Sequence, residues 1–280
     1  MILVRKNAIN ELASVFSCIH QLPHLEILNL TFNPAYDDCG VDSDDKGRVS
    51  LQMSTLFALN TSFTFRVAPK LTSLSLHNLR IWRLFLLESY FRSFFTTLRR
   101  LQLSVLADVA PVPSCFPFQW YKFWAALPRK ILVPAQHTLT ELTLHSESYI
   151  DDSSEMSFGG LHFPHLFALS LCKFVFTLHI GVAPFILRHA ATLAQLELLS
   201  CRLSTTGGVP YSLTNSALQS WAHTWVRFEA ELTNLVVLRV DSPNYRYFSN
   251  PSELRKDAAA LQRFQTTVAA RSSEGMRSEA

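Results

Sequence analysis

The sequence predicts an α/β fold in which about seven parallel strands form a concave sheet, with helices on the convex side. The main observation is a pattern that occurs twice within residues 163–203. Leu166, Leu169 and Leu171 give L-x-x-L-x-L, and the same spacing starts again at Leu193, a step of 27 along the chain (193 − 166). A pattern that recurs at a fixed step of this length indicates a repeated structural unit.

The second copy extends through Cys201 and Leu203, which completes the signature of a leucine-rich repeat. Between the two copies, PFILRHAATL has the spacing of a short helix, with Phe185, Ile186 and His189 on related turns. A unit of strand, turn and helix cannot bury its apolar face alone. The pattern therefore predicts a leucine-rich-repeat solenoid with further units on either side.

The rest of the chain supplies those units. Seven strands are expected to begin at Leu25, Leu71, Leu98, Leu139, Leu166, Leu193 and Leu235. Three of the steps between these starts are equal, since 98 − 71, 166 − 139 and 193 − 166 all give 27, and the other three are longer. We interpret the long steps as insertions that form surface loops near 34–50, 107–136 and 204–215. The proline-rich second insertion contains one short helical stretch, WYKFWAAL.

Helices are also expected at both ends of the chain. Residues 7–22 carry one apolar stripe, which predicts an N-terminal capping helix within residues 1–24. The repeats then fill residues 25–248. Asn250, Pro251 and Glu253 form a helix-start signal, so residues 249–280 are expected to be a C-terminal helix and a flexible tail.

Side-chain alternation along each strand places the leucines in the core and the intervening residues on the concave surface. Six steps of about 4.8 Å make that surface on the order of 30 Å long, which suits a protein partner better than a small molecule. The competing interpretation is a face that is merely solvated. The candidate partner-binding residues are Asn29, Thr31, Ser75, His77, Arg100, Gln102, Glu141, Thr143, His145, Gln195, Glu197, Arg239 and Asp241.

Composition excludes several other classes of protein. The chain is 48% hydrophobic, and its net charge of +3 includes no block of basic residues, so nucleic acid is not expected as a partner. No apolar run reaches the length of a membrane span. The five cysteines are scattered and form no C-x-x-C pair, and no signal peptide is recognisable. These features favour an intracellular protein, either cytoplasmic or nuclear.

The sequence predicts no catalytic residue, no metal site and no cofactor, so we do not expect an enzyme. G-x-S-x-G, Ser-x-x-Lys and a phosphate-binding loop are absent. Residues 42–47 resemble a calcium loop, but Lys46 occupies a ligand position and Met53 stands where a glutamate is required. His162 and His165 are followed by no further ligand at metal-site spacing. FPHL at 163–166 recurs as LPHL at 22–25, so we interpret His165 and His24 as structural or solvated residues of a repeat-entry turn.

Three segments resemble the leucine-rich-repeat region of fungal F-box proteins of the basidiomycete type, over about residues 22–240. They are FPHLFALSLCKFVF, PFILRHAATLAQLELLSCRL and LQSWAHTWVRFEAELTNLVVLRV. In that family an F-box binds the Skp1 adaptor of a cullin ubiquitin ligase, and the repeats recruit the substrate. No recognisable F-box precedes Leu25, so Skp1–cullin binding is expected only if an F-box exists upstream.

The resemblance implies a protein–protein interaction module that serves as the substrate-recognition part of a ubiquitin ligase. Its partner would be a protein substrate, of unknown identity, on the concave face. Two alternatives remain open. One is a non-catalytic scaffold repeat protein unrelated to ubiquitin ligation, and the other is a truncated copy without function.

Overall fold

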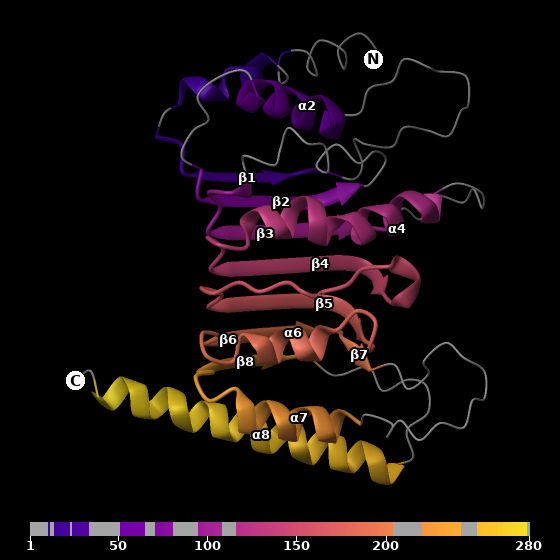
Figure 1. The fold of residues 1–280 in the computed structure, drawn as a ribbon, viewed down its shortest axis with the longest axis vertical. Helices are drawn as coiled ribbons and strands as arrows, with labels where there is room; N and C mark the ends of the chain where they lie inside the picture. The colour runs from indigo at the N-terminus through magenta and orange to yellow at the C-terminus, as the bar shows by residue number, and fades with distance from the viewer. Residues whose placement is uncertain are drawn as a thin grey trace. The chain divides into compact units, whose positions relative to one another are not determined.

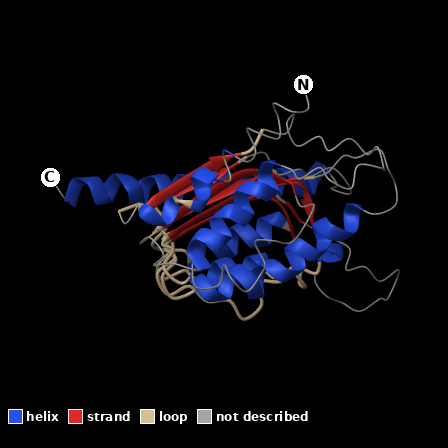
Figure 2. Ribbon diagram, turned by 90° about the horizontal axis from the view of Figure 1, so that it is seen from above, coloured by secondary structure: helices blue, strands red, loops and turns tan. Residues whose placement is uncertain are grey.

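Parallel strands carry the leucine pattern in each of two α/β units, residues 1–139 and 140–280. The computed structural model describes residues 11, 14–22, 24–33, 51–64, 71–80, 95–107, 116–203, 220–241 and 251–278. Every strand pairing within the two units is parallel, which confirms the expected α/β class with a parallel sheet (Figure 1). Helices and strands are distinguished by colour in Figure 2.

The strands of the first unit lie in the order β1 (Ile27–Thr31), β2 (Ser73–Arg80) and β3 (Arg100–Leu106). They pair leucine to leucine, with Leu28 opposite Leu74 and Leu74 opposite Leu101. All three leucines are buried. The expected strands are therefore present, and each begins two residues after the first leucine of its pattern.

Helix α2 (Leu51–Thr64) contacts β2 through one polar side chain, and α4 (Phe116–Leu127) carries buried aromatic residues. In α2 the buried Gln52 amide donates to Arg80 O at 2.7 Å, and its oxygen accepts from Arg80 N at 2.9 Å. Both backbone groups at the end of β2 are thus satisfied by one side chain. In α4 the residues Phe123 and Trp124 are buried edge to face, with ring centroids 5.4 Å apart.

In the insertion at 107–136 the sequence predicted one helical stretch, WYKFWAAL, and a loop elsewhere. The stretch lies in α4, but the expected loop is wrong for residues 128–135. After α4 the chain continues as a π-helical turn, Pro128–Leu132, and then as α5 (Val133–Ala135). Pro128 and Pro134 each stand in the first turn of a new helical segment, where a missing N–H leaves no intrahelical bond unmade. Prolines therefore divide this helical stretch without ending it.

The second unit repeats the leucine register over four strands: β4 (Glu141–Ile150), β5 (Ala168–Phe176), β6 (Gln195–Leu199) and β8 (Val237–Val240). Leu142, Leu169, Leu196 and Leu238 lie opposite one another in sequence. A further short strand, β7 (Arg202–Leu203), pairs with the end of β5. The 27-residue step in the sequence thus corresponds to the move from β4 to β5 and from β5 to β6.

One hydrogen-bond arrangement recurs at the start of β2, β3, β5, β6 and β8. The carbonyl oxygen of Thr140 accepts from both Phe167 N and Ala168 N, at 2.7 and 3.1 Å. The same pair of bonds joins Phe167 O to the start of β6, and within the first unit it joins Glu26 O to the start of β2. Because these turns are stacked, each turn supplies the acceptor that the next turn needs.

A left-handed residue follows three of the leucine patterns, those of β2, β5 and β6. Asn78, Lys173 and Ser200 have φ of 57°, 62° and 50°, and each lies two residues after the third leucine. The residues that follow them are all buried: Leu79, Phe174 and Cys201. The local change of backbone direction therefore turns the next side chain into the core.

Aromatic residues fill the space between the strands and helices of the second unit. Phe158 stacks on Phe185 of α6 (Val182–Arg188), with ring centroids 4.4 Å apart. In α7 (Trp221–Glu231) Trp221 stacks on Trp225 at 4.6 Å, and Phe176 of β5 contacts Trp221. These aromatic side chains thus form much of the core of the second unit.

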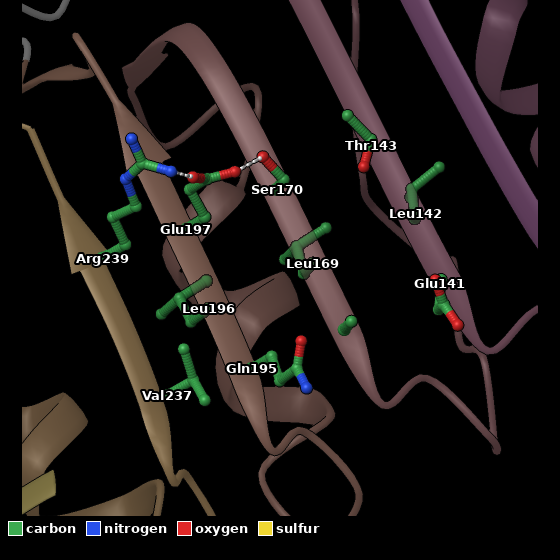
Figure 3. Close-up of a pocket in the computed structure, with 11 residues that line it drawn as sticks. Glu141, Leu142, Thr143, Leu169, Ser170, Gln195, Leu196, Glu197, Val237 and Arg239 are labelled. Atoms are coloured by element: carbon green, nitrogen blue, oxygen red, sulfur yellow. Dashed lines mark hydrogen bonds and ion pairs between the residues drawn. The ribbon is translucent and has the colours of Figure 1, made fainter. Parts of the chain in front are cut away.

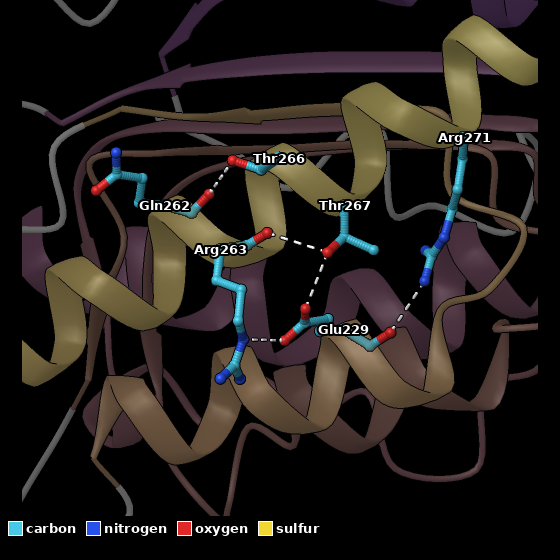
Figure 4. Close-up of polar contacts among 6 residues, drawn as sticks. All are labelled: Glu229, Gln262, Arg263, Thr266, Thr267 and Arg271. Carbon is cyan, nitrogen blue, oxygen red and sulfur yellow. Dashed lines mark hydrogen bonds and ion pairs between the residues drawn. The ribbon is translucent and has the colours of Figure 1, made fainter.

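The second unit ends in α8 (Pro251–Ser278), a helix of 28 residues that packs along α7 (Figure 1). Phe264 is fully buried and stacks on Trp225. The expected flexible tail is wrong for residues 271–278, which are helical. Polar contacts with α7 hold this part of α8: Arg271 donates to Leu232 O at 2.7 Å and to Glu229 O at 3.1 Å (Figure 4).

Other expectations fall partly or wholly outside the described residues. In the N-terminal segment, residues 14–17 are helical and lead into a 3-10 turn, Ile19–Gln21. The expected loops at 34–50 and 204–215, and with them the acidic segment 42–47, are not among the residues described. None of the described helices combines the length and the apolar character needed to cross a membrane.

Candidate functional site

The candidate site is the solvent-facing side of β4, β5, β6 and β8, which we term the β4–β8 face. The leucines of these strands point into the core, while the residues between them are exposed or partly exposed. This alternation follows from the two-residue period of a strand. Three steps between strands, at about 4.8 Å each, make the face about 14 Å wide.

The structure brings together the seven candidate residues that the sequence placed in the second unit. Glu141, Gln195, Arg239 and Asp241 are exposed, while Thr143, His145 and Glu197 are partly exposed. The register places Glu197 directly opposite Arg239 and places Ser170 between Thr143 and Glu197. All seven residues therefore belong to one surface.

The six candidates of the first unit form a separate group on β1, β2 and β3. Asn29, Ser75 and Gln102 lie opposite one another, and Thr31 lies opposite His77. Arg100 pairs with Ser73 and is exposed. Alternation thus holds in both units, and the contacts that define a site are richest on the β4–β8 face.

A chain of polar contacts crosses the β4–β8 face, and we term its four residues the polar chain: His145, Ser170, Glu197 and Arg239. His145 Nε2 lies 3.0 Å from Ser170 Oγ, which donates to Glu197 Oε2 at 2.5 Å. Glu197 Oε1 then pairs with an Arg239 guanidinium nitrogen at 3.0 Å (Figure 3). Each of these residues comes from a different strand.

The order of the polar chain determines its chemistry. Ser170 has one hydroxyl proton and donates it to Glu197, so the bond to His145 requires Nε2–H of His145 as the donor. In a Ser–His–acid triad the histidine stands in the middle and accepts the serine proton. Here the serine stands in the middle, and the arginine neutralises the carboxylate. The arrangement therefore orders four surface side chains and does not activate a nucleophile.

Cys172 is the other potential nucleophile on this face. Burial raises the pKa of its thiol, the adjacent Lys173 opposes that rise, and the carboxylates of Asp241 and Glu197 add to it. A raised pKa keeps the thiol protonated at neutral pH, and the thiolate is the reactive form. The environment of Cys172 thus disfavours nucleophilic catalysis.

A shallow hollow of about 330 Å³ lies on the β4–β8 face beside the polar chain (Figure 3). Ala168 carries only a methyl group and stands between Glu141 and Gln195, which are opposite it on the neighbouring strands. Eleven residues line the hollow, namely Glu141, Leu142, Thr143, Ala168, Leu169, Ser170, Gln195, Leu196, Glu197, Val237 and Arg239. Its floor is the sheet itself, so the hollow is open to a protruding side chain.

Two surface residues of β5, Ala168 and Ser170, were not among the candidates chosen from the sequence. Alternation placed Ala168 and Ser170 on the surface, but their small side chains gave no reason to rank them as site residues. Ser170 joins His145 to Glu197, and the small size of Ala168 opens the hollow. The available signal was their position between the polar residues of two flanking strands.

The histidines and cysteines that could suggest a metal site have other partners. His189 is buried, with Nε2 accepting from Phe163 N at 2.9 Å and Nδ1 facing Phe185 O at 2.7 Å. The Cys201 thiol donates to Leu171 O at 3.5 Å, and burial raises its pKa to about 12. Over the described residues, no three His, Cys, Asp or Glu side chains gather in a way that could hold a metal ion.

Comparisons with protein-family models, curated proteins and solved structures yield no match to this chain. The geometry of the β4–β8 face is therefore the basis on which a function is proposed.

Proposed function

We propose that the chain is a leucine-rich-repeat protein whose solvent-facing sheet surface binds a partner protein. The observation that carries this proposal is the β4–β8 face, where four strands present polar side chains in register above a continuous leucine core. Repeat proteins of this kind use the surface formed by their stacked strands for binding.

A protein partner suits the β4–β8 face better than a small substrate. Ligand pockets bury most of the ligand's surface between convergent walls. The hollow here is shallow, and the charge of Glu197 is already compensated by Arg239. Polar, partly exposed side chains of this kind are typical of the rim of a protein interface.

The resemblance to the repeat region of F-box proteins extends the proposal: the bound protein would be a substrate for ubiquitin ligation. That role requires an F-box that links the chain to the Skp1 adaptor and the cullin. Without such a link, binding at the same face would serve a non-catalytic scaffold.

Affinity capture with a charge-insertion variant tests the proposal. Gln195→Arg places a bulky cation on the β4–β8 face, and Gln265→Arg places the same change on an exposed position of α8. Wild type and both variants would be incubated with an extract of the cells from which the protein comes, and the retained proteins identified by mass spectrometry. We expect proteins that are retained by wild type and Gln265→Arg to be lost from Gln195→Arg.

Equal retention by all three chains would contradict binding at the β4–β8 face. The same data separate the two roles of a bound partner. Recovery of the adaptor and cullin with the full-length protein would support substrate recruitment, and their consistent absence would remove that role while leaving the binding proposal intact.

A further inference from the structure

The hollow on the β4–β8 face has an uneven charge distribution. Among its lining residues, Glu141 and Glu197 each carry a negative charge and Arg239 a positive one, which gives a sum of −1. Arg239 pairs with Glu197 at 3.0 Å. Glu141 forms no ion pair with any residue in the described part of the chain, and its side chain is exposed. Within the hollow, the charge that has no ion-pair partner among the described residues therefore lies at Glu141.

The same hollow has an apolar part beside this carboxylate. Ala168 presents its methyl group next to Glu141, and Val237, which is 47% exposed, lies on the far side of Gln195. An exposed valine in a polar surface is most favourably covered by aliphatic carbon. The amide oxygen of Gln195 adds a hydrogen-bond acceptor between the two (Figure 3).

A long basic side chain matches this combination. Lysine and arginine carry an aliphatic stem that packs on apolar surface and a cationic head that seeks carboxylates and amide oxygens. The stem would pack on the methyl group of Ala168, and the head would bond to Glu141 and Gln195, which flank Ala168 on the neighbouring strands. An acidic side chain would instead meet Glu141 with like charge, because Arg239 is already engaged by Glu197.

We propose that the hollow receives a lysine or arginine side chain of the partner protein, with Glu141 as the principal recognition residue. This inference rests on the proposed function, since it names the side-chain chemistry that the β4–β8 face selects. It predicts that a bound segment is basic at one fixed position, while the rest of its sequence is set by the remainder of the face.

Peptide selection tests the inference without a known partner. A phage-displayed library of random 12-residue peptides would be selected on the full chain, on Glu141→Gln and on Ala168→Phe. Glu141→Gln removes the charge at nearly constant shape, and Ala168→Phe fills the hollow while keeping the charge. Glu155→Gln makes the same charge change at an exposed position outside the hollow and serves as the control.

Wild type and Glu155→Gln should select peptides with a strongly preferred lysine or arginine at one position. A representative peptide should bind Glu141→Gln at least about tenfold more weakly, which is the loss of one charge-assisted hydrogen bond. It should also bind Ala168→Phe more weakly, and this second variant guards against a loss caused by misfolding of the first.

Two other results would overturn the inference in different ways. Selection of peptides without a basic preference, or equal binding by Glu141→Gln, would remove the basic-side-chain specificity and leave the proposed function standing. Failure of wild type to select any peptide above background would count against both the inference and the proposed function.

Discussion

His189 is a titratable side chain in the aromatic core of the second unit, 1% exposed and in contact with Phe185. Its two ring nitrogens satisfy one backbone N–H, of Phe163, and one backbone C=O, of Phe185. Burial lowers the pKa of His189 to about 4, the bond to Phe185 O opposes that shift, and the nearby His162 and Arg188 add to it. The neutral imidazole is therefore the form that the fold requires.

Acid should destabilise the protein through His189. Because its folded-state pKa lies below the ordinary value of 6.5, its contribution to stability is complete above pH 6.5 and is lost as the pH falls toward 4. The expected loss between pH 7 and pH 4.5 is about 2–3 kcal/mol. Urea unfolding at the two pH values measures it, with the His189→Leu variant as the comparison.

His189→Leu should show a smaller loss of stability in acid, because it has no group to protonate at this position. At pH 7 it should be less stable than wild type by about 1–3 kcal/mol, since Phe163 N–H loses its buried acceptor. The exposed His179→Leu is the matched control and should retain the full wild-type loss. A variant at His189 with unchanged pH dependence would contradict this account.

Neighbouring residues of β6 should respond very differently to truncation. Leu196 is 1% exposed, whereas Gln195 beside it is exposed. Leu196→Ala should cost about 2–5 kcal/mol of unfolding free energy because it leaves a cavity in the core. Gln195→Ala should change stability by less than about 0.5 kcal/mol. Similar costs for both variants in urea titrations would contradict the alternation on which the β4–β8 face depends.

Part of this residue-scale picture could be predicted from the sequence. The helical spacing of PFILRHAATL placed His189 on the same stripe as Phe185 and Ile186, and a polar residue in such a stripe needs buried hydrogen-bond partners. The identity of the Phe163 N–H partner could not be predicted, because it lies 26 residues away in a turn. The role of Ser170 likewise depends on neighbours in other strands.

At the scale of elements, α8 holds α7 at both of its ends. Near the N-terminus of α7, Ala222 N donates to the buried carboxylate of Asp257 at 2.7 Å. At the C-terminus, Arg271 donates to the carbonyls of Glu229 and Leu232. An acid at the positive end and a base at the negative end both complement the helix dipole.

A third contact joins the side chain of Glu229, in the last turn of α7, to α8 (Figure 4). Glu229 accepts from Arg263 at 2.7 Å and from Thr267 at 2.9 Å. Burial pushes the pKa of Glu229 upward, but the hydrogen bonds from Arg263 and Thr267 and the charges of Arg263 and Arg271 together hold it below its usual range. The α7–α8 pair is therefore fastened by polar contacts in addition to the Trp225–Phe264 stack.

We term the contacts of Asp257 and Arg271 with the two ends of α7 the clamp. Removing either contact should destabilise α7. Asp257→Ala and Arg271→Met should each lower stability by about 1–2 kcal/mol, because backbone groups at a helix end lose their partners. Hydrogen–deuterium exchange should show faster exchange of α7 amides and little change in β4 and β5. Glu253→Ala, an exposed change one turn before Asp257, is the control. Unchanged α7 exchange in both clamp variants would contradict the proposed clamp.

The sequence predicted the start of α8 but not its length, and it did not predict the helical segments that contain Pro128 and Pro134. The Asn250–Glu253 signal predicted a helix, and α8 starts at Pro251, but its length depends on α7, which the sequence does not place beside it. Pro128 and Pro134 suggested a loop, because proline lacks an N–H. Here that loss falls in the first turn of each new segment and is tolerated.

At the scale of the whole molecule, the leucine spacing determined most of what could be predicted. The pattern that starts at Leu166 starts again at Leu193 and so predicted two equivalent strands; in the structure Leu169 lies opposite Leu196. The recurring double acceptor at the strand entrances, such as Thr140 O, was not predictable, because it involves only backbone atoms. In each unit the leucine spacing thus sets which residues of neighbouring strands pair. The backbone hydrogen bonds at the strand starts then follow from the stacking of the turns.

The central claim is that the β4–β8 face binds a partner protein, and site-specific photo-crosslinking tests it most directly. A benzophenone amino acid would be introduced at Gln195, on the face, and at Gln265, an equally exposed position on α8. After irradiation in an extract of the protein's own cells, we predict discrete cross-linked species from position 195 and none of the same size from position 265. No cross-link from position 195, or the same products from both positions, would contradict the account.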